Sequence, residues 1–256
     1  MLPELNEDVI TLVIQATLCS APIGPNLEST TRYRRRSLLP LSQACRHLRE
    51  YCLPFMFREV YSTPRGIYPR SIWKYIVILH LRDRLPSSVE RFDVSPYVDV
   101  LPSLVALRRL VLHVDPGITF DALLRAAGST PHLYDLFLED TQLAFPPLSS
   151  SPGLNHLRRL SISIATPPRN MSEDELRAEL QNVHECMRTL SAHLQDLEIP
   201  ADICPLRTLA DHSWPQLRAL VMTGHAPAYG RTTVSAAVHQ ENQKCSKVAI
   251  QSYKTL

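Results

Sequence analysis

Three side chains in the second half of the chain have the residue types of a zinc site. His184, Cys186 and His193 lie within ten residues of one another and carry the nitrogen and sulfur atoms that zinc prefers. A structural zinc ion takes four protein ligands, and no fourth ligand lies close to this group. Because the group also falls on a predicted helix, we interpret its members as independent helix residues and expect no metal.

The sequence shows no motif of nucleophilic or phosphate chemistry. It contains no G-x-S-x-G elbow, no G-x-x-x-x-G-K-[ST] loop and no H-E-x-x-H pair. Adjacent carboxylates occur at Glu139 and Asp140 and at residues 173–175, where solvated turns and a helix start explain them. We therefore expect a protein without catalysis and without a cofactor.

The composition narrows the remaining classes of protein. With 45% hydrophobic residues over 256 positions, the chain can bury a core. A net charge of +2 argues against nucleic acid as a partner, and no apolar run approaches the roughly 20 residues of a membrane span. The six cysteines form no C-x-x-C pair, and acidic residues near the amino terminus do not resemble a secretory signal. These features predict reduced thiols and an intracellular protein of the cytoplasm, the nucleus or both.

Two apolar stripes near the amino terminus predict two helices. Asn6 is placed to cap the first helix, which runs to about Leu18 and carries a stripe at three- and four-residue spacing: Val9, Ile10, Val13 and Ile14. The second helix, with Ser37 as its N-cap, Pro40 in its first turn and Pro54 beyond its end, carries the other stripe: Leu38, Leu41, Cys45, Leu48 and Cys52.

Residues 21–36, between these helices, are predicted to form a long loop. They contain Pro22, Gly24 and Pro25, followed by a cluster of four arginines between positions 32 and 36. A nuclear-import signal and a phosphate-binding patch are two functional interpretations of this cluster. We favour a solvated loop, since short charge runs are usually exposed.

The first sixty residues resemble the F-box family, most closely in its fungal form. The resemblance rests on residues 5–10 with Val13 and Ile14, on the Leu-Ser-x-x-Cys-Arg stretch at residues 41–46, and on the apolar segment at residues 53–60. It implies a Skp-type adaptor and a cullin scaffold as partners, with the adaptor bound by the helical stripes: Leu5, Val9, Ile10, Val13, Ile14, Leu38, Leu41, Cys45 and Leu48. The alternative is that these helices only cap the open end of a repeat array.

A short pattern, Leu-x-x-Leu-x-Leu, recurs along the rest of the chain. It occurs at 107, 110 and 112, at 133, 136 and 138, at 157, 160 and 162, at 194, 197 and 199, at 217, 220 and 222, and earlier at 76, 79 and 81. The central positions are 31, 26, 24, 37 and 23 residues apart, close to the period of leucine-rich repeats. Each Leu-x-Leu predicts a short strand of a parallel sheet with its leucines in the core.

Helices are expected between these strands, including residues 120–127 and 172–190. Ser172 and Glu175 form a capping box at the start of the second of these helices. The pattern ends after Thr223. Residues 224–256 have no further apolar triplet, and two interpretations stay open: a disordered tail, or sequence foreign to the repeat array.

Residues between the inward leucines should form the open surface of the sheet. The positions are Arg109 and Val111, Asp135 and Phe137, Arg159 and Ser161, Asp196 and Glu198, and Ala219 and Val221. Both charge signs and an aromatic ring suit a protein partner, so Arg109, Asp135, Phe137, Arg159, Asp196 and Glu198 are the predicted substrate-binding residues. Solubilisation of the sheet face explains them equally well.

These observations together predict an α/β protein in three parts. An F-box-like helical module occupies residues 1–60, an irregular leucine-rich-repeat solenoid occupies residues 61–223, and the tail follows. The function expected from the resemblance is the substrate-recognition subunit of a Skp-cullin-F-box type ubiquitin ligase, binding a protein substrate through the repeats. The alternative is a leucine-rich-repeat scaffold for protein interactions without a role in ubiquitin ligation.

Overall fold

The structure is a computed structural model of the 256-residue chain. The residues it describes are 6–19, 27–62, 67–83, 93–114, 118–139, 154–163, 173–200, 204, 209, 213–225, 231–237 and 249–253.

The chain forms an α/β structure around one nine-stranded sheet. Its strands are β1 (Glu59–Tyr61), β2 (Ile78–Arg82), β3 (Arg109–His113), β4 (Asp135–Leu138), β5 (Arg159–Ile162), β6 (Asp196–Pro200), β7 (Ala219–His225), β8 (Arg231–Ala237) and β9 (Ala249–Tyr253). They lie side by side in chain order. Strands β1 to β7 are parallel, and the six that the sequence predicted are β2 to β7, while β8 and β9 add antiparallel pairs.

The recurring leucines hold a single register across the parallel strands. Leu79, Leu110, Leu136, Leu160, Leu197 and Leu220 are each paired with the next along the sheet. All six side chains are buried in one continuous core. Val60 of β1 pairs with Leu79 and is also fully buried. The register therefore begins one strand earlier than the leucine pattern alone indicated.

A row of backbone carbonyls fixes the edge at which the parallel strands begin. The carbonyl of Arg108, for example, accepts the N–H groups of Tyr134 and Asp135 at 2.9 and 3.0 Å. The carbonyl of Tyr134 in turn accepts two N–H groups from residues 158 and 159. The backbone carbonyls of residues 58, 77, 158 and 195 likewise each accept two N–H groups from the segment that leads into the following strand. These hydrogen bonds tie the beginnings of neighbouring strands together.

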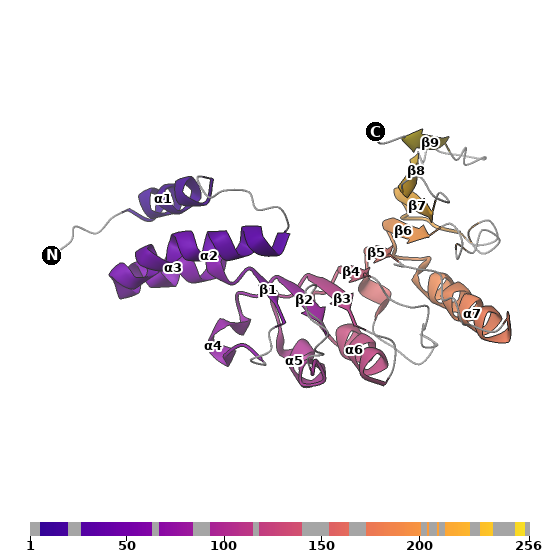
Figure 1. Ribbon diagram of the computed structural model, residues 1–256, viewed down its shortest axis with the longest axis horizontal. Coiled ribbons are helices and arrows are strands. Elements are labelled where there is room, and N and C mark those ends of the chain that lie inside the picture. Colours follow the sequence, from indigo (N-terminus) through magenta and orange to yellow (C-terminus); the bar gives the residue numbers. More distant parts are fainter. Residues whose placement is uncertain are drawn as a thin grey trace.

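Helices and turns link successive parallel strands and lie on one side of the sheet (Figure 1). They are α4 (Arg70–Trp73), α5 (Tyr97–Val100), the 3-10 turn η1 (Leu101–Ser103), α6 (Ile118–Gly128), η3 (Leu154–His156) and α7 (Glu173–Leu190). The helices predicted at residues 120–127 and 172–190 are confirmed as α6 and α7. Their buried residues, such as Leu123 and Met187, complete the core beneath the leucine rows.

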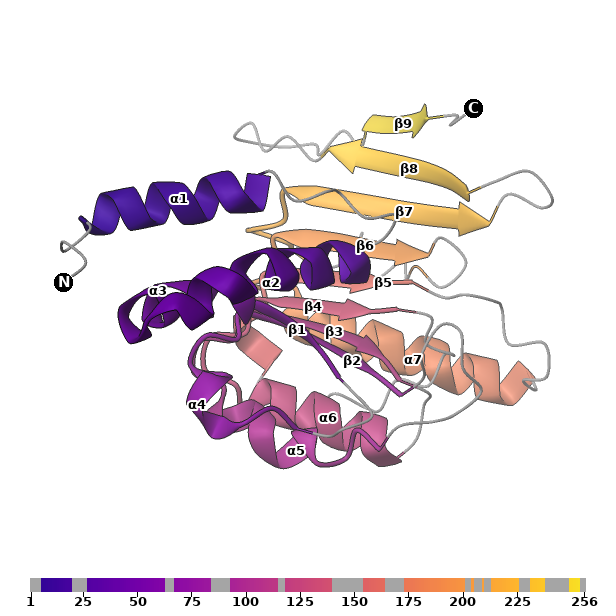
Figure 2. The same ribbon diagram turned by 60° about the vertical axis from the view of Figure 1, so that its left-hand side comes forward.

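The first three helices form a separate module on the opposite side of the sheet, next to β1 (Figures 1 and 2). They are α1 (Glu7–Cys19), α2 (Leu27–Ala44) and α3 (Arg46–Met56). Their own small core consists of Ile10, Ile14, Leu38, Cys52 and Met56. The predicted first helix and its cap are confirmed, since the side-chain oxygen of Asn6 accepts the N–H of Asp8 at 3.0 Å.

The predicted second helix and the loop before it need correction. The prediction of a loop over residues 21–36 is wrong for residues 27–36, which form the first half of α2. Ser37 is therefore no N-cap, and Pro40 lies inside α2. The break comes at Cys45, whose sulfur accepts the N–H of Leu48 and caps α3, and Pro54 lies inside that helix. The hydrogen bond from Arg35 of α2 to the carbonyl of Glu59 in β1 stabilises the helical conformation of residues 27–36.

The residues after Thr223 also differ from the sequence interpretation, which placed no element there. Strand β7 extends to His225, β8 pairs with it, and β9 pairs with β8. These strands bring no Leu-x-x-Leu-x-Leu triplet, so periodicity gave no signal for them. The pairing is antiparallel, which needs only a short connection rather than a crossover helix.

The leucine register should dominate stability. Leu136 lies on the central strand β4 with only 2% of its surface exposed. We expect Leu136→Ala to lower the free energy of unfolding by about 2 to 5 kcal/mol, because it removes buried methyl groups and leaves a cavity. Urea unfolding followed by circular dichroism measures this. Val105→Ala is the control, since that side chain is 58% exposed and should cost less than about 0.5 kcal/mol. Equal losses would contradict the assignment of the core.

Candidate functional site

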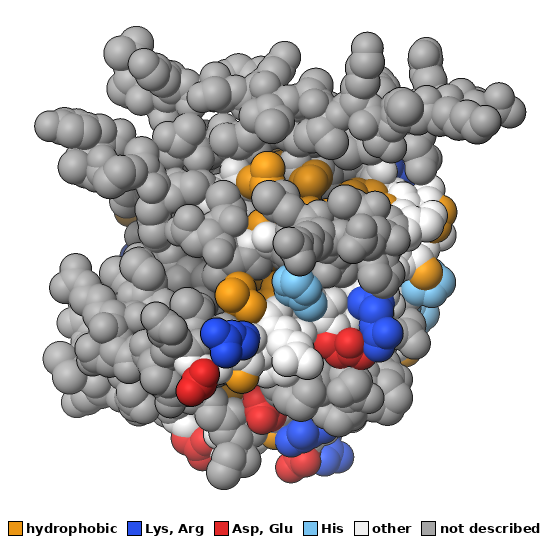
Figure 3. All heavy atoms as spheres, turned by 90° about the vertical axis from the view of Figure 1, so that its right-hand side faces the viewer, with side chains coloured by type: hydrophobic (Ala, Val, Ile, Leu, Met, Phe, Trp, Pro, Cys, Tyr) orange, Lys and Arg blue, Asp and Glu red, His pale blue; other side chains and the backbone are white. Residues whose placement is uncertain are grey.

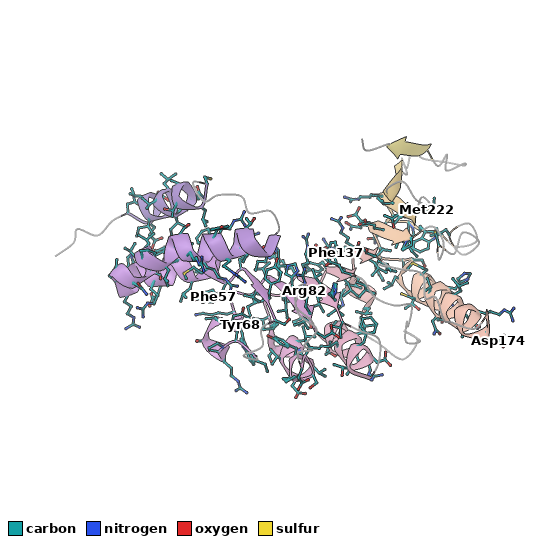
Figure 4. All side chains as sticks on the ribbon, viewed as in Figure 1. Phe57, Tyr68, Arg82, Phe137, Asp174 and Met222 are labelled. Atoms are coloured by element: carbon teal, nitrogen blue, oxygen red, sulfur yellow. The ribbon has the colours of Figure 1, made fainter. Side chains whose placement is uncertain are left out.

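An aromatic ring between two arginines lies at the centre of the open face of the sheet. Phe137 on β4 has the guanidinium carbon of Arg109, from β3, at 5.0 Å from its ring centroid and that of Arg159, from β5, at 5.2 Å. Both contacts have cation–π geometry. The parallel register produces this group, because positions 109, 135 and 159 form one row across three strands. Figure 4 labels Phe137 on this part of the sheet.

The two arginines differ in how their charge is balanced. Arg109 donates to Oδ2 of Asp135 through Nε at 3.1 Å and through Nη2 at 2.9 Å. Within the described residues, Arg159 has no carboxylate within ion-pair distance, although Asp196 is its register neighbour. The group therefore presents an aromatic ring contacted by two guanidinium groups, beside a row in which Arg109, Asp135, Arg159 and Asp196 alternate in charge.

The predicted open-face residues divide into accessible and covered ones. Eight of the ten are partly exposed: Arg109, Asp135, Phe137, Arg159, Asp196, Glu198, Ala219 and Val221. Val111 and Ser161 are buried, contrary to the prediction that they contribute to the surface. The hydroxyl of Ser161 donates to Oε2 of Glu198 at 2.9 Å. The larger neighbouring side chains shield these two smaller ones from solvent.

A polar cluster joins the helical module to the first two strands. Oε1 of Glu59 lies 3.0 Å from Nε2 of His80 and accepts the hydroxyl of Tyr61 at 3.1 Å. The ring of Tyr61 stacks on that of His80, with 4.2 Å between centroids, and Arg82 lies over Tyr61 at 5.6 Å. Burial by itself raises the pKa of Glu59, but the partners His80 and Tyr61 together with the charge of Arg34 hold it below its usual value.

Arg35 of α2 connects this cluster to the helices. Its Nε donates to the carbonyl of Met56 at 2.9 Å and its Nη2 to that of Glu59 at 2.7 Å. The guanidinium also lies over the rings of Phe57 and Tyr68, at 5.4 and 5.9 Å. Figure 4 places Phe57 and Tyr68 together where the helical module meets the sheet. One arginine of the predicted solvated cluster is thus a structural contact.

The helical module leaves apolar side chains exposed on α1. Val9, Leu12 and Val13 are 42%, 63% and 46% exposed. They lie three and four residues apart, so they form one strip along the helix, which we call the α1 strip. Ile10 and Ile14 point the other way, into the module core. Sequence reasoning missed Leu12, although its spacing from Val9 was visible.

The predicted adaptor-binding residues consequently fall into different environments. Val9 and Val13 are on the surface, whereas Ile10, Ile14 and Leu38 are buried. The other three, Leu41, Cys45 and Leu48, are partly exposed. Leu5 lies outside the described residues.

The candidate chemical residues of the sequence are dispersed in the structure. Cys186 is 1% exposed in the core, and burial raises the pKa of its thiol to about 12. His193 is exposed beyond the end of α7. Among the residues that the structure describes, no group of three or more His, Cys, Asp or Glu side chains could hold a metal ion. Glu139 lies 3.9 Å from Arg82, and Asp140 is not among the described residues.

Comparisons of the chain with protein-family models, with curated proteins and with solved structures find no match. Within the described residues, no helix has both the length and the apolar character needed to cross a membrane.

Arg35 should stabilise the junction between α2 and the sheet. We expect Arg35→Ala to lower the free energy of unfolding by about 2 to 4 kcal/mol, because two charge-assisted hydrogen bonds are lost and two carbonyls lose their partner. Chemical denaturation of the whole chain gives the value. Arg36→Ala, on the exposed side of the same helix, is the matched control and should change it by less than about 0.5 kcal/mol. A comparable loss in both variants would rule out the junction role.

Proposed function

We propose that this chain is a non-catalytic substrate receptor of a Skp-cullin-F-box type ubiquitin ligase, built from an F-box-like module and an irregular leucine-rich-repeat solenoid. The observation that carries the proposal is the α1 strip, formed by Val9, Leu12 and Val13. These exposed apolar side chains lie on a module that has its own core and is fixed to a curved sheet. Exposed apolar strips of this kind commonly mark protein interfaces.

In this proposal the α1 strip binds a Skp-type adaptor, and the adaptor links the chain to a cullin scaffold. Leu41, Cys45 and Leu48 are partly exposed, and Leu41 and Leu48 also pack against the module core, so in this proposal they contribute a second, smaller apolar contact. Ile10, Ile14 and Leu38 serve a different purpose, since they hold the module together. The rigid connection through Arg35 keeps the adaptor in a constant position relative to the sheet.

The open face of the sheet is the proposed substrate-binding surface. The Phe137 ring with Arg109 and Arg159 supplies the aromatic and arginine contacts that dominate protein interfaces. Ubiquitin transfer would take place on other subunits inside the cell. This chain would contribute proximity, by raising the effective concentration of substrate lysines at the enzyme.

Adaptor binding is the first test. We expect Leu12→Asp and Val13→Asp each to weaken binding of a purified Skp-type adaptor at least tenfold, because an unpaired carboxylate is costly in an apolar interface. Titration calorimetry measures the affinity. Ala178→Asp, at an exposed position on α7, should leave it within about twofold. If the wild-type chain does not bind the adaptor at all, the ligase role fails and the chain is better described as an interaction scaffold.

Substrate capture is the second test. Phe137→Ala combined with Arg159→Ala should reduce captured substrate proteins at least tenfold while adaptor binding is unchanged, because this pair removes the central ring and one of the two guanidinium groups that contact it. Quantitative mass spectrometry of affinity-purified complexes gives both quantities. Arg177→Ala, exposed on α7, is the control. Retention of every captured protein by the double variant would refute the open-face assignment.

A further inference from the structure

The segments that lead into the parallel strands carry only positive charges among their described residues, although β1, β4 and β6 themselves begin with the acidic residues Glu59, Asp135 and Asp196. Five exposed cations lie in these segments: Arg58, Lys74, Arg108, Arg158 and Arg218. They come from the segments that lead into β1, β2, β3, β5 and β7. The described residues of the lead-in segments 57–58, 74–77, 104–108, 129–134, 157–158, 191–195 and 213–218 contain no Asp or Glu. We call these five residues the basic edge.

Backbone geometry fixes the four arginines of the basic edge at regular intervals. Each directly precedes the first residue of its strand, and in three of them, Arg58, Arg108 and Arg158, the carbonyl accepts two N–H groups from the next lead-in. Neighbouring strands are about 4.8 Å apart, so arginines on alternate strands are about 10 Å apart and the whole edge extends about 29 Å. The row is therefore a regularly spaced array of cations that follows the curve of the sheet (Figure 1).

Mixed charge elsewhere makes the basic edge distinctive. On the open face, Arg109 pairs with Asp135, and on α7, Arg188 pairs with Glu185. Positive and negative side chains also lie beside one another on the face of the molecule shown in Figure 3. The dipole of an α-helix favours cations at its carboxyl end. Arg108 and Arg158 instead follow three-residue 3-10 turns, so a helix dipole does not account for the row.

We propose that the basic edge is a docking surface for an acidic segment of a protein partner, separate from the α1 strip and the open face. An extended peptide advances about 3.3 Å per residue, so carboxylates on every third residue are about 10 Å apart and match the arginine spacing. Guanidinium groups suit this role because they bind carboxylates through paired hydrogen bonds.

The aromatic residues of the same segments favour a protein over a nucleic acid. Tyr134 has the guanidinium of Arg158 over its ring at 4.7 Å, and Tyr75 has the ammonium of Lys74 over its ring at 4.9 Å. Each ring therefore already has one face covered by a cation of this chain, whereas single-stranded nucleic acids bind by stacking bases on such faces. Five cations are also few for a partner whose affinity depends on phosphate neutralisation.

The test uses a fluorescein-labelled peptide of twelve glutamates as the probe and the full chain as the receptor. Fluorescence anisotropy at low salt should show saturable binding that weakens as salt is added. The variant Arg108→Glu with Arg158→Glu should weaken binding at least tenfold. The control variant, Arg36→Glu with Arg177→Glu, makes the same change in net charge at exposed positions on α2 and α7 and should stay within about twofold.

Three outcomes would overturn the proposal. The first is no saturable binding of the glutamate peptide. The second is an equal loss in the edge and control variants, which would mean that net charge alone is responsible. The third is tighter binding of a labelled twelve-nucleotide single-stranded RNA than of the peptide. Melting temperatures of both variants establish that they are folded, and Arg158→Gln, which removes charge without reversing it, should give an intermediate loss.

Discussion

Six of the seven parallel strands, β1 to β6, begin directly after a residue whose carbonyl accepts two N–H groups from the segment that leads into the next strand. At residue 108 this places Tyr134 and Asp135, and at residue 134 it places Arg158 and Arg159. Because both N–H groups are fixed, the following strand cannot slip by one residue without breaking the pair. A slip would also turn every buried leucine toward solvent. The carbonyl row and the leucine core therefore specify the same register, and the surfaces on either side of the sheet depend on it.

That register converts residues far apart in the sequence into compact groups. Arg109, Asp135 and Arg159 are separated by 26 and 24 positions in the chain, yet they form one row on the open face. Phe137 lies in the adjacent row and contacts both arginines. The same repeated register aligns Arg108, Arg158 and Arg218 along the basic edge. Two surfaces of different charge character thus arise from one repeated backbone geometry.

The junction at α2 links the helical module to this sheet by polar contacts, in addition to Phe57, which packs against both apolar cores. Arg35 donates to two carbonyls, and the partly buried Glu59 is stabilised as a carboxylate by His80 and Tyr61. Hydrogen bonds have strict distance and angle requirements. A polar junction therefore fixes the direction of α2 more narrowly than apolar packing would, which matters for a protein that is proposed to hold two partners at once.

The sequence by itself determined the parallel sheet, its six recognised leucine positions and the helices at α1, α6 and α7, because periodic burial and capping residues are local signals. It did not determine that residues 27–36 are helical, since the contacts of Arg35 come from Met56 and Glu59 more than twenty positions away. Burial of Val111 and Ser161, the strands β8 and β9, and the alignment of the basic edge likewise needed the tertiary structure. Most of these features depend on interactions between segments that are distant in the chain, which no local pattern of residues encodes. Strand β8 pairs with its neighbour β7, but without an apolar triplet it gave no periodic signal.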